Sequence, residues 1–247
     1  ETARKHYAEW NETVDQHSGP TNEVPPSYGQ VVGAINRICD STDLALTAAG
    51  GLPGELCKNW KTRSIGTFDC EFGFSCMGYE IAGGWGAKMA NPSRDVIVFV
   101  GDGSYLMLNS DIYSTVLTGH KMIVIVCDNG GFSVINRLQN FKGSASFNNL
   151  LQDCKVENLQ GVDFVQHATS MGALGEHVES TAELEAAFKR AKAADRTYVI
   201  CIKTKPSQWT PGDAWWDVGV PEVSDREEVR QARADHTEGQ KRQRLGV

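Results

Sequence analysis

Three features are scarce or missing in this sequence, and each absence excludes a class of protein. No two cysteines stand in a CxxC arrangement, which excludes a zinc ribbon or a Cys-ligated iron–sulfur cluster. No apolar stretch approaches the ~18 residues of a membrane-spanning helix. Positive charge is not in excess, because 24 Lys and Arg stand against 31 Asp and Glu, a net charge of −7. We therefore expect no nucleic-acid partner and no membrane association.

The cysteines that are present also carry information. There are 7, an odd number, and they are scattered, with Cys127 and Cys201 inside apolar runs. This pattern favours reduced thiols and a cytoplasmic protein. The 247 residues suffice for one large domain with tails. We expect an N-terminal helix and linker over 1–26, a main domain over 27–210, and a charged C-terminal tail over 211–247.

Apolar runs alternate with helical patterns along the main domain. The runs DVIVFV (95–100) and KMIVIVC (121–127) are typical of parallel strands covered on both faces. Between them we predict one helix over 104–118, with an apolar stripe made of Tyr105, Leu108, Ile112 and Val116. The alternation predicts an α/β fold with a doubly wound, mostly parallel sheet, in which ligands bind beyond the carboxyl ends of the strands.

Further elements fit this architecture. We predict helices over 1–17, from a Ser27 cap to Cys39, over 78–90, and over 180–194, the last with a Ser180–Glu183 capping box. Strands are predicted within 43–51 and 197–205. The segment 225–247 is expected to form either an exposed helix or a disordered tail.

The stretch FVGDGSY at 99–105 places Asp102 between two glycines where a strand ends. Such junctions commonly bind phosphate through backbone N–H groups, and a carboxylate should repel that anion. Asn129 follows Asp102 by 27 positions. A helix of about 15 residues spans roughly 22 Å and a strand of about 7 residues returns roughly 23 Å. We therefore expect Asp102 and Asn129 to emerge side by side at one edge of the sheet.

These residues predict a site for a hard cation. A carboxylate (Asp102), an amide oxygen (Asn129) and a main-chain carbonyl (Gly131, whose missing side chain permits close approach) are ligands that Mg²⁺ prefers, with phosphate oxygens completing the shell. Asp102 would then hold the metal that faces the phosphates. Gly103 and Ser104 could offer N–H groups to the same phosphates.

Other interpretations of GDGS are weaker. A dinucleotide-binding fingerprint would need Gly or Ala where Leu106 stands, and a Walker loop would need a following Gly-Lys-Ser/Thr. An ordinary strand-to-helix turn would leave the spacing to Asn129 unexplained.

The GDG…DN pair at this spacing resembles the diphosphate-binding domain of thiamine-diphosphate-dependent enzymes, over about residues 25–205. The resemblance implies that Asp102, Asn129 and the Gly131 carbonyl bind Mg²⁺, and that Gly103 and Ser104 contact the diphosphate of thiamine diphosphate. It also places Gly50 and Gly51 in a second diphosphate-contacting loop.

The segment GFSCMGYEIAGGWGAKMA resembles the part of these enzymes that lies under the thiazolium ring. By this resemblance the Met77 side chain would hold the cofactor in its bent shape, and the Ser75 carbonyl would accept from its exocyclic amine. A core methionine is the alternative for Met77.

Four segments, AAGGLPGELCKNW, FGFSCMGYEIAGG, GDGSYLMLNSDI and DAWWDVGVPEVS, narrow the resemblance to members that open a cyclic 1,2-diketone by hydrolytic C–C cleavage in myo-inositol breakdown. Alternatives are an acetolactate-synthase-like carboligase, a 2-oxo-acid decarboxylase, or a non-catalytic Mg²⁺/diphosphate module. Trp215 and Trp216 could close over the substrate or serve as an interface.

The resemblance also implies a partner. Family members carry a pyrimidine-binding domain whose glutamate activates the cofactor, and nothing in this sequence encodes it. With a start at Glu1, we expect the chain to be the C-terminal portion of a longer enzyme or one subunit of a split one, inactive alone, and the complete enzyme to be a homo-oligomer.

Overall fold

The chain is described from a computed structural model, which covers residues 1–155, 157–158, 161–213 and 218–243. Within these ranges one sheet has all its strands parallel, in the order β2-β1-β3-β4-β6-β5. The strands are β1 (Leu44–Thr47), β2 (Phe68–Cys70), β3 (Val96–Gly101), β4 (Ile123–Asp128), β5 (Leu174–Val178) and β6 (Tyr198–Lys203). The predicted α/β fold with a doubly wound parallel sheet is confirmed.

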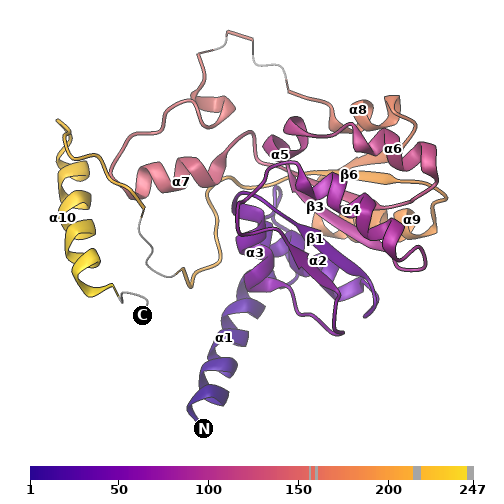
Figure 1. Ribbon diagram of the computed structural model, residues 1–247, viewed down its shortest axis with the longest axis horizontal. Coiled ribbons are helices and arrows are strands. Elements are labelled where there is room, and N and C mark those ends of the chain that lie inside the picture. The colour runs from indigo at the N-terminus through magenta and orange to yellow at the C-terminus, as the bar shows by residue number, and fades with distance from the viewer. Residues whose placement is uncertain (156, 159–160, 214–217, 244–247) are drawn as a thin grey trace.

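Helices follow most of the strands (Figure 1). They are α1 (Thr2–Ser18), α2 (Tyr28–Ile38), α3 (Gly51–Asn59), α4 (Tyr79–Ala90), α5 (Asp102–Met107), α6 (Asp111–Thr118), α7 (Ser133–Phe141), α8 (Phe164–Ser170), α9 (Thr181–Ala193) and α10 (Glu227–Arg242), with a 3-10 turn, η1, at Leu151–Asp153. Across the described ranges, none of these helices has both the length and the apolar character that a membrane span requires.

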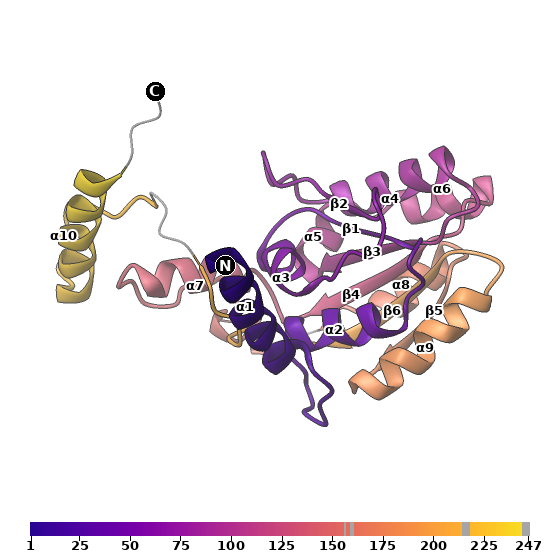
Figure 2. The ribbon, with the colours of Figure 1, turned by 90° about the horizontal axis from the view of Figure 1, so that it is seen from below.

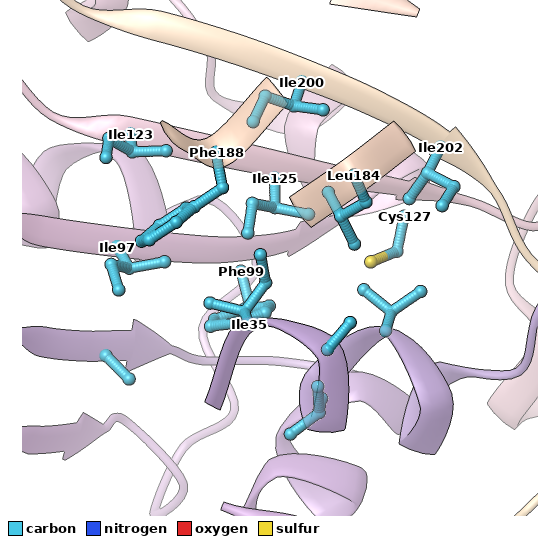
Figure 3. Packing of buried hydrophobic residues seen from close by; sticks show 14 of the residues in the cluster. Ile35, Ile97, Phe99, Ile123, Ile125, Cys127, Leu184, Phe188, Ile200 and Ile202 are labelled. Carbon is cyan, nitrogen blue, oxygen red and sulfur yellow. The ribbon is translucent and has the colours of Figure 1, made fainter. Parts of the chain in front are cut away.

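The sheet is buried on both faces, which is why its central strands are continuous apolar runs. Alternate residues of β3, β4 and β6 pack against α2, α3 and α9 on one face, and the intervening residues pack against α4, α5, α6 and α8 on the other. Figure 2 shows α2 and α9 on the side of the sheet opposite α4 and α6. Figure 3 shows the first cluster, where Phe188 and Leu184 of α9 and Ile35 of α2 approach the isoleucines of the strands.

Side-chain caps fix where several helices begin. Ser27 and Gln30 form a reciprocal capping box at α2, with Gln30 N–H donating to Ser27 Oγ (3.2 Å) and Ser27 N–H donating to Gln30 Oε1 (2.7 Å). At α9, Ser180 accepts from Glu183 N–H (3.2 Å), while the Glu183 carboxylate accepts from Glu179 N–H (2.9 Å). Both predicted helix starts are confirmed.

The single helix predicted over 104–118 is wrong. The chain forms α5 and α6, separated by an extended Leu108 (φ −153°, ψ 97°). The break has a local cause, because Asn109 turns its side-chain amide back onto the Tyr105 carbonyl (3.1 Å) instead of continuing the helix. The predicted stripe fails at the same place, since Tyr105 and Ile112 are fully buried whereas Leu108 is 43 % exposed.

At the C-terminal end the helical alternative is correct, because α10 covers most of the charged segment. Trp215 and Trp216 lie outside the described residues. The domain boundaries at 26–27 and 210–211 stay a prediction.

The strand order defines where a ligand can bind. From β1 the chain proceeds first outward to β2 and then back across to β3 on the other side of β1. In open α/β sheets, such a switch point leaves a crevice beyond the carboxyl ends of the two strands. The segments at this edge are those that follow β1, β3 and β4, and they carry Gly50, Asp102 and Asn129.

Candidate functional site

Asp102 and the Asp128–Gly131 segment lie side by side, as the spacing predicts. In the ladder between β3 and β4, Gly101 pairs with Cys127, so Asp102 and Asp128 occupy the next positions at the same edge. Asp102 is 6 % exposed, and its carboxylate accepts hydrogen bonds from the backbone N–H groups of Gly103 and Gly131. One crossover therefore brings the two halves of the motif into direct contact.

Two buried carboxyl groups meet at this point. Asp128 is 5 % exposed, accepts from Gly130 N–H (3.0 Å) and forms an ion pair with Lys203 of β6. Burial and the neighbouring Asp128 charge raise the pKa of Asp102 to about 7, although the two backbone N–H groups act in the opposite direction. A cation bound beside Asp102 would remove this penalty on its ionised form.

Asn129, which directly follows Asp128, has a side-chain oxygen without a hydrogen-bond partner among the described residues. Its side-chain amide nitrogen donates to Ser133 Oγ (2.6 Å) and to the hydroxyl of Tyr28. Its Oδ1 atom is buried and has no hydrogen-bond partner among the described residues. Because buried polar atoms are almost always satisfied, an orphaned amide oxygen beside a buried carboxylate indicates a ligand for a cation.

Gly131 is a glycine for steric reasons. Its φ is +140°, and a Cβ atom there would lie 2.4 Å from the carbonyl oxygen of Asn149. The opposing strand-like segment fixes this loop through Phe132 N–H to Asn149 O (2.7 Å) and Leu151 N–H to Gly130 O (2.8 Å). Two backbone hydrogen bonds and one close steric contact therefore define the conformation of this loop.

Gly103 must be small for a different reason. A Cβ atom at Gly103 would lie 2.6 Å from the ring of Phe132, so the start of α5 packs directly against the Asn129 loop. The first backbone N–H groups of a helix have no partner within the helix. This contact brings the start of α5 against the loop that contains Asn129.

The glycines after β1 lie on the other side of the switch point. Gly50 has φ +91°, a conformation that favours glycine, and Gly51 begins α3. A Cβ atom at Gly51 would lie 2.3 Å from the ring of Trp209, which closes that side of the loop. Both residues follow β1, and so they lie at the edge of the sheet where Asp102 and Asn129 also lie.

The segment containing Ser75 and Met77 reaches the same edge through Gly78. Gly78 N–H donates to Ser104 Oγ (2.8 Å), and a Cβ atom at Gly78 would lie 2.4 Å from that of Leu108. Ser75 is exposed with φ 54°, and Met77 is half-buried. The structure therefore brings this segment to the GDGS turn. Contacts of Ser75 and Met77 with a cofactor stay a prediction.

A metal here would be held by a mixed set of donors. In the described part of the chain, no group of three or more His, Cys, Asp or Glu side chains converges on a metal site. The Asp102 carboxylate, the free Asn129 Oδ1 and a backbone carbonyl at Gly131 are all oxygens, which suits a hard cation such as Mg²⁺. The residues present therefore fit the predicted ion.

Sequence reasoning missed four residues of the site: Tyr28, Glu80, Asp128 and Lys203. Asp128 could have been found, because it directly precedes Asn129 at a strand end. The other three come from distant segments, and no local pattern marks them. Glu80, at the start of α4, is fully buried and accepts hydrogen bonds from three different loops of the site.

Comparisons with known proteins show the family and the fold of this chain. The family profile "Thiamine pyrophosphate enzyme, C-terminal TPP binding domain" matches residues 48–202. A 3D-(3,5/4)-trihydroxycyclohexane-1,2-dione hydrolase of Bacillus cereus (strain AH820) is 40% identical over 209 residues, which is 82% of this chain and 32% of that protein. The protein of the same name in Bacillus thuringiensis (strain Al Hakam) is 39% identical over 233 residues, 89% of this chain and 36% of that protein.

Among solved structures, a thiamine diphosphate-dependent 4-hydroxybenzoylformate decarboxylase of Rhodococcus jostii RHA1 superposes with a TM-score of 0.67. The alignment covers 75% of this chain and 34% of that protein, at 19% identity, and supports the fold alone. The chain spans about a third of the length of the curated relatives it matches.

Proposed function

This chain belongs to the thiamine pyrophosphate enzymes, as their C-terminal TPP-binding domain, and we propose that it holds thiamine diphosphate through a bound Mg²⁺ ion. The metal ligands would be the Asp102 carboxylate, Asn129 Oδ1 and the Gly131 carbonyl. The observation that carries this proposal is the buried, partnerless Oδ1 of Asn129 beside the buried carboxyl group of Asp102.

The backbone at both sides of the switch point would hold the diphosphate. We assign this role to Gly50 and Gly51 after β1, and to Gly103 and Ser104 at the start of α5. None of them offers a charged side chain, so they would contribute backbone N–H groups, and the N–H of Gly103 would be shared with the Asp102 carboxylate. The Ser75 carbonyl and the Met77 side chain would orient the thiamine rings.

When bound, the cofactor would supply a carbon nucleophile for a carbonyl group and a ring that can take up the electron pair of a breaking C–C bond. The chain's own residues bind and orient it. Asp102 and Asn129 fix the metal, and the Phe132 ring against Gly103 keeps the loop of Asn129 and the helix start in one unit. The activating glutamate is not assigned to this chain.

For the reaction, we propose hydrolytic cleavage of a C–C bond in a cyclic 1,2-diketone, trihydroxycyclohexane-1,2-dione, to give 5-deoxy-glucuronate. Relatives with this activity in their names are 39% and 40% identical to most of the chain. Hydrolysis of a ring 1,2-diketone is compatible with the cofactor's chemistry, because the carbonyl next to the breaking bond is the electrophile that it requires.

Domains of this kind normally work with a pyrimidine-binding domain. We propose that this domain comes from the same or a partner polypeptide, that the complete enzyme is a homo-oligomer, and that the 247-residue chain has no activity alone. The chain covers only about a third of its curated relatives, which leaves room in those proteins for such a domain.

The proposal is tested by supplying the chain with a pyrimidine-binding domain, thiamine diphosphate and Mg²⁺, and offering the cyclic diketone or pyruvate. Consumption of the diketone but not of pyruvate supports the proposed reaction. Consumption of pyruvate would instead indicate a carboligase or decarboxylase. Turnover by the chain without the second domain would refute the need for a partner.

A further inference from the structure

Glu80 is the second residue of α4, and its side chain is fully buried beneath the candidate site. One carboxylate oxygen, Oε1, accepts from Ala49 N–H (3.3 Å) and from the Ser104 hydroxyl (2.9 Å). The other, Oε2, accepts from Gly78 N–H (3.0 Å) and lies 2.8 Å from the same hydroxyl. Donors from three separate loops thus converge on a single side chain.

The three loops follow the three strands at the switch point. Ala49 directly precedes Gly50 and Gly51 after β1, and Gly78 ends the segment of Ser75 and Met77 after β2. Ser104 lies in the first turn of α5, which directly follows β3. These are the segments assigned to the diphosphate and to the thiamine rings. The distances among the loops are therefore set through Glu80.

Ser104 links the loops a second time. Its hydroxyl donates to Glu80 and accepts from Gly78 N–H (2.8 Å), and the residue is 3 % exposed. Its side chain is consequently directed into the protein, which leaves its backbone N–H as the group able to face a phosphate. By binding the Ser104 hydroxyl, Glu80 also helps to orient the backbone N–H of Ser104 in the first turn of α5.

A carboxylate is the side chain that this position requires. Each donor that the described residues give Glu80 is neutral: the backbone N–H groups of Ala49, Gly78 and Glu80 itself, and the Ser104 hydroxyl. An ionised carboxylate accepts at both oxygens, whereas an amide would turn an NH₂ group toward one of these donors. The burial of such a group without a cation partner is costly, so its presence here needs a compensating role.

We propose that Glu80 is the positioning residue that holds the three cofactor-binding loops in register for thiamine diphosphate. This inference rests on the proposed function of the site. Glu80 has both oxygens engaged below the site, so it positions backbone groups and does not touch the reacting atoms.

The test compares Glu80→Gln with Asp43→Asn, which also converts a buried carboxylate to an amide. Asp43 is 4 % exposed, precedes β1 at the opposite edge of the sheet, and pairs with Lys192. Two quantities are measured in each protein: the exchange rates of the backbone amides in the absence of cofactor, and the affinity for thiamine diphosphate with Mg²⁺ by calorimetry.

In Glu80→Gln we expect faster exchange at Ala49 and Gly78, and an affinity at least about tenfold weaker, the loss for one hydrogen bond to a charged group. Asp43→Asn should leave both quantities at the wild-type values. Unchanged exchange or unchanged affinity in Glu80→Gln would overturn the proposal. If the wild-type chain supplied with the pyrimidine-binding domain binds no cofactor, the proposed function fails, and the exchange rates alone decide whether Glu80 holds the loops.

Protection of the β3 and β4 amides shows whether Glu80→Gln is folded. If it is not, Ser104→Ala serves as the second variant, because it removes only the hydroxyl between Glu80 and Gly78. Ser104→Ala should speed the exchange of the Gly78 amide and leave the exchange rate of the Ala49 amide unchanged. If both amides exchanged at the wild-type rate, the proposal would be contradicted.

Discussion

The carboxyl groups of Asp102 and Asp128 lie together at the ends of two adjacent strands, and both are buried. Lys203 pairs with Asp128, while Asp102 is served by two backbone N–H groups. In the absence of a cation this arrangement disfavours the ionised form of Asp102. The buried Asp102 carboxylate therefore lowers the stability of the metal-free chain at the position where the metal is expected to bind.

Asp102→Asn should make the metal-free chain more stable. At pH 8 the substitution removes a buried negative charge that faces another, so we expect the free energy of unfolding to rise by about 1–2 kcal/mol. Urea denaturation in the presence of EDTA measures it. The exposed Asp195→Asn should change stability by less than about 0.5 kcal/mol. A large loss of stability in Asp102→Asn would show that the carboxylate is structural.

Tyr28→Phe should weaken the metal site without unfolding the protein. The Tyr28 hydroxyl accepts from the Asn129 amide, which keeps Oδ1 directed away from Tyr28. Ser133 Oγ still holds the amide in the variant. We therefore expect only a moderate loss of Mg²⁺ affinity in the presence of thiamine diphosphate, about three- to tenfold. An unchanged affinity would mean that the orientation of Asn129 is set elsewhere.

Gly131→Ala should be severely destabilising. A Cβ atom would lie 2.4 Å from the Asn149 carbonyl oxygen, at a φ of +140° that disfavours any side chain. We expect a loss of about 2–4 kcal/mol in thermal or urea unfolding. Gly86→Ala is the matched control, because it has open space in the middle of α4 and should gain about 0.5–1 kcal/mol. Equal effects of the two substitutions would contradict the packing of the Asn129 loop.

Glu55 gives a prediction for pH. Burial raises its pKa above the ordinary 4.5, although hydrogen bonds from Thr210 act against the shift. A raised carboxyl pKa contributes stability that is complete below the unfolded-state pKa and is lost as the pH rises through the folded-state pKa. The advantage of the wild type over Glu55→Gln should therefore shrink as the pH rises above the ordinary pKa of 4.5. Urea titrations at each pH measure the difference in free energy of unfolding between the two proteins. If this difference grew with pH, the pKa of Glu55 would be lowered in the folded protein and not raised.

The sequence predicted the parts of the site that depend on regular geometry. Because helix rise and strand rise are fixed, the 27-position spacing was enough to place Asn129 beside Asp102. The parallel strands were predictable because burial on both faces leaves continuous apolar runs.

The parts that could not be predicted depend on local competition or on distant partners. The break between α5 and α6 arises from the Asn109 side chain competing with the helix backbone, which periodicity alone does not reveal. Glu80 was missed because its donors, Ala49, Gly78 and Ser104, come together only in the folded sheet.

The Mg²⁺ dependence of thiamine diphosphate affinity decides whether Asp102 holds a metal through which the cofactor binds. Calorimetry with and without Mg²⁺ should show strong dependence in the wild-type chain and its loss in Asp102→Ala. Equal affinity with and without Mg²⁺ in the wild type, or full Mg²⁺-dependent affinity in Asp102→Ala, would contradict the account.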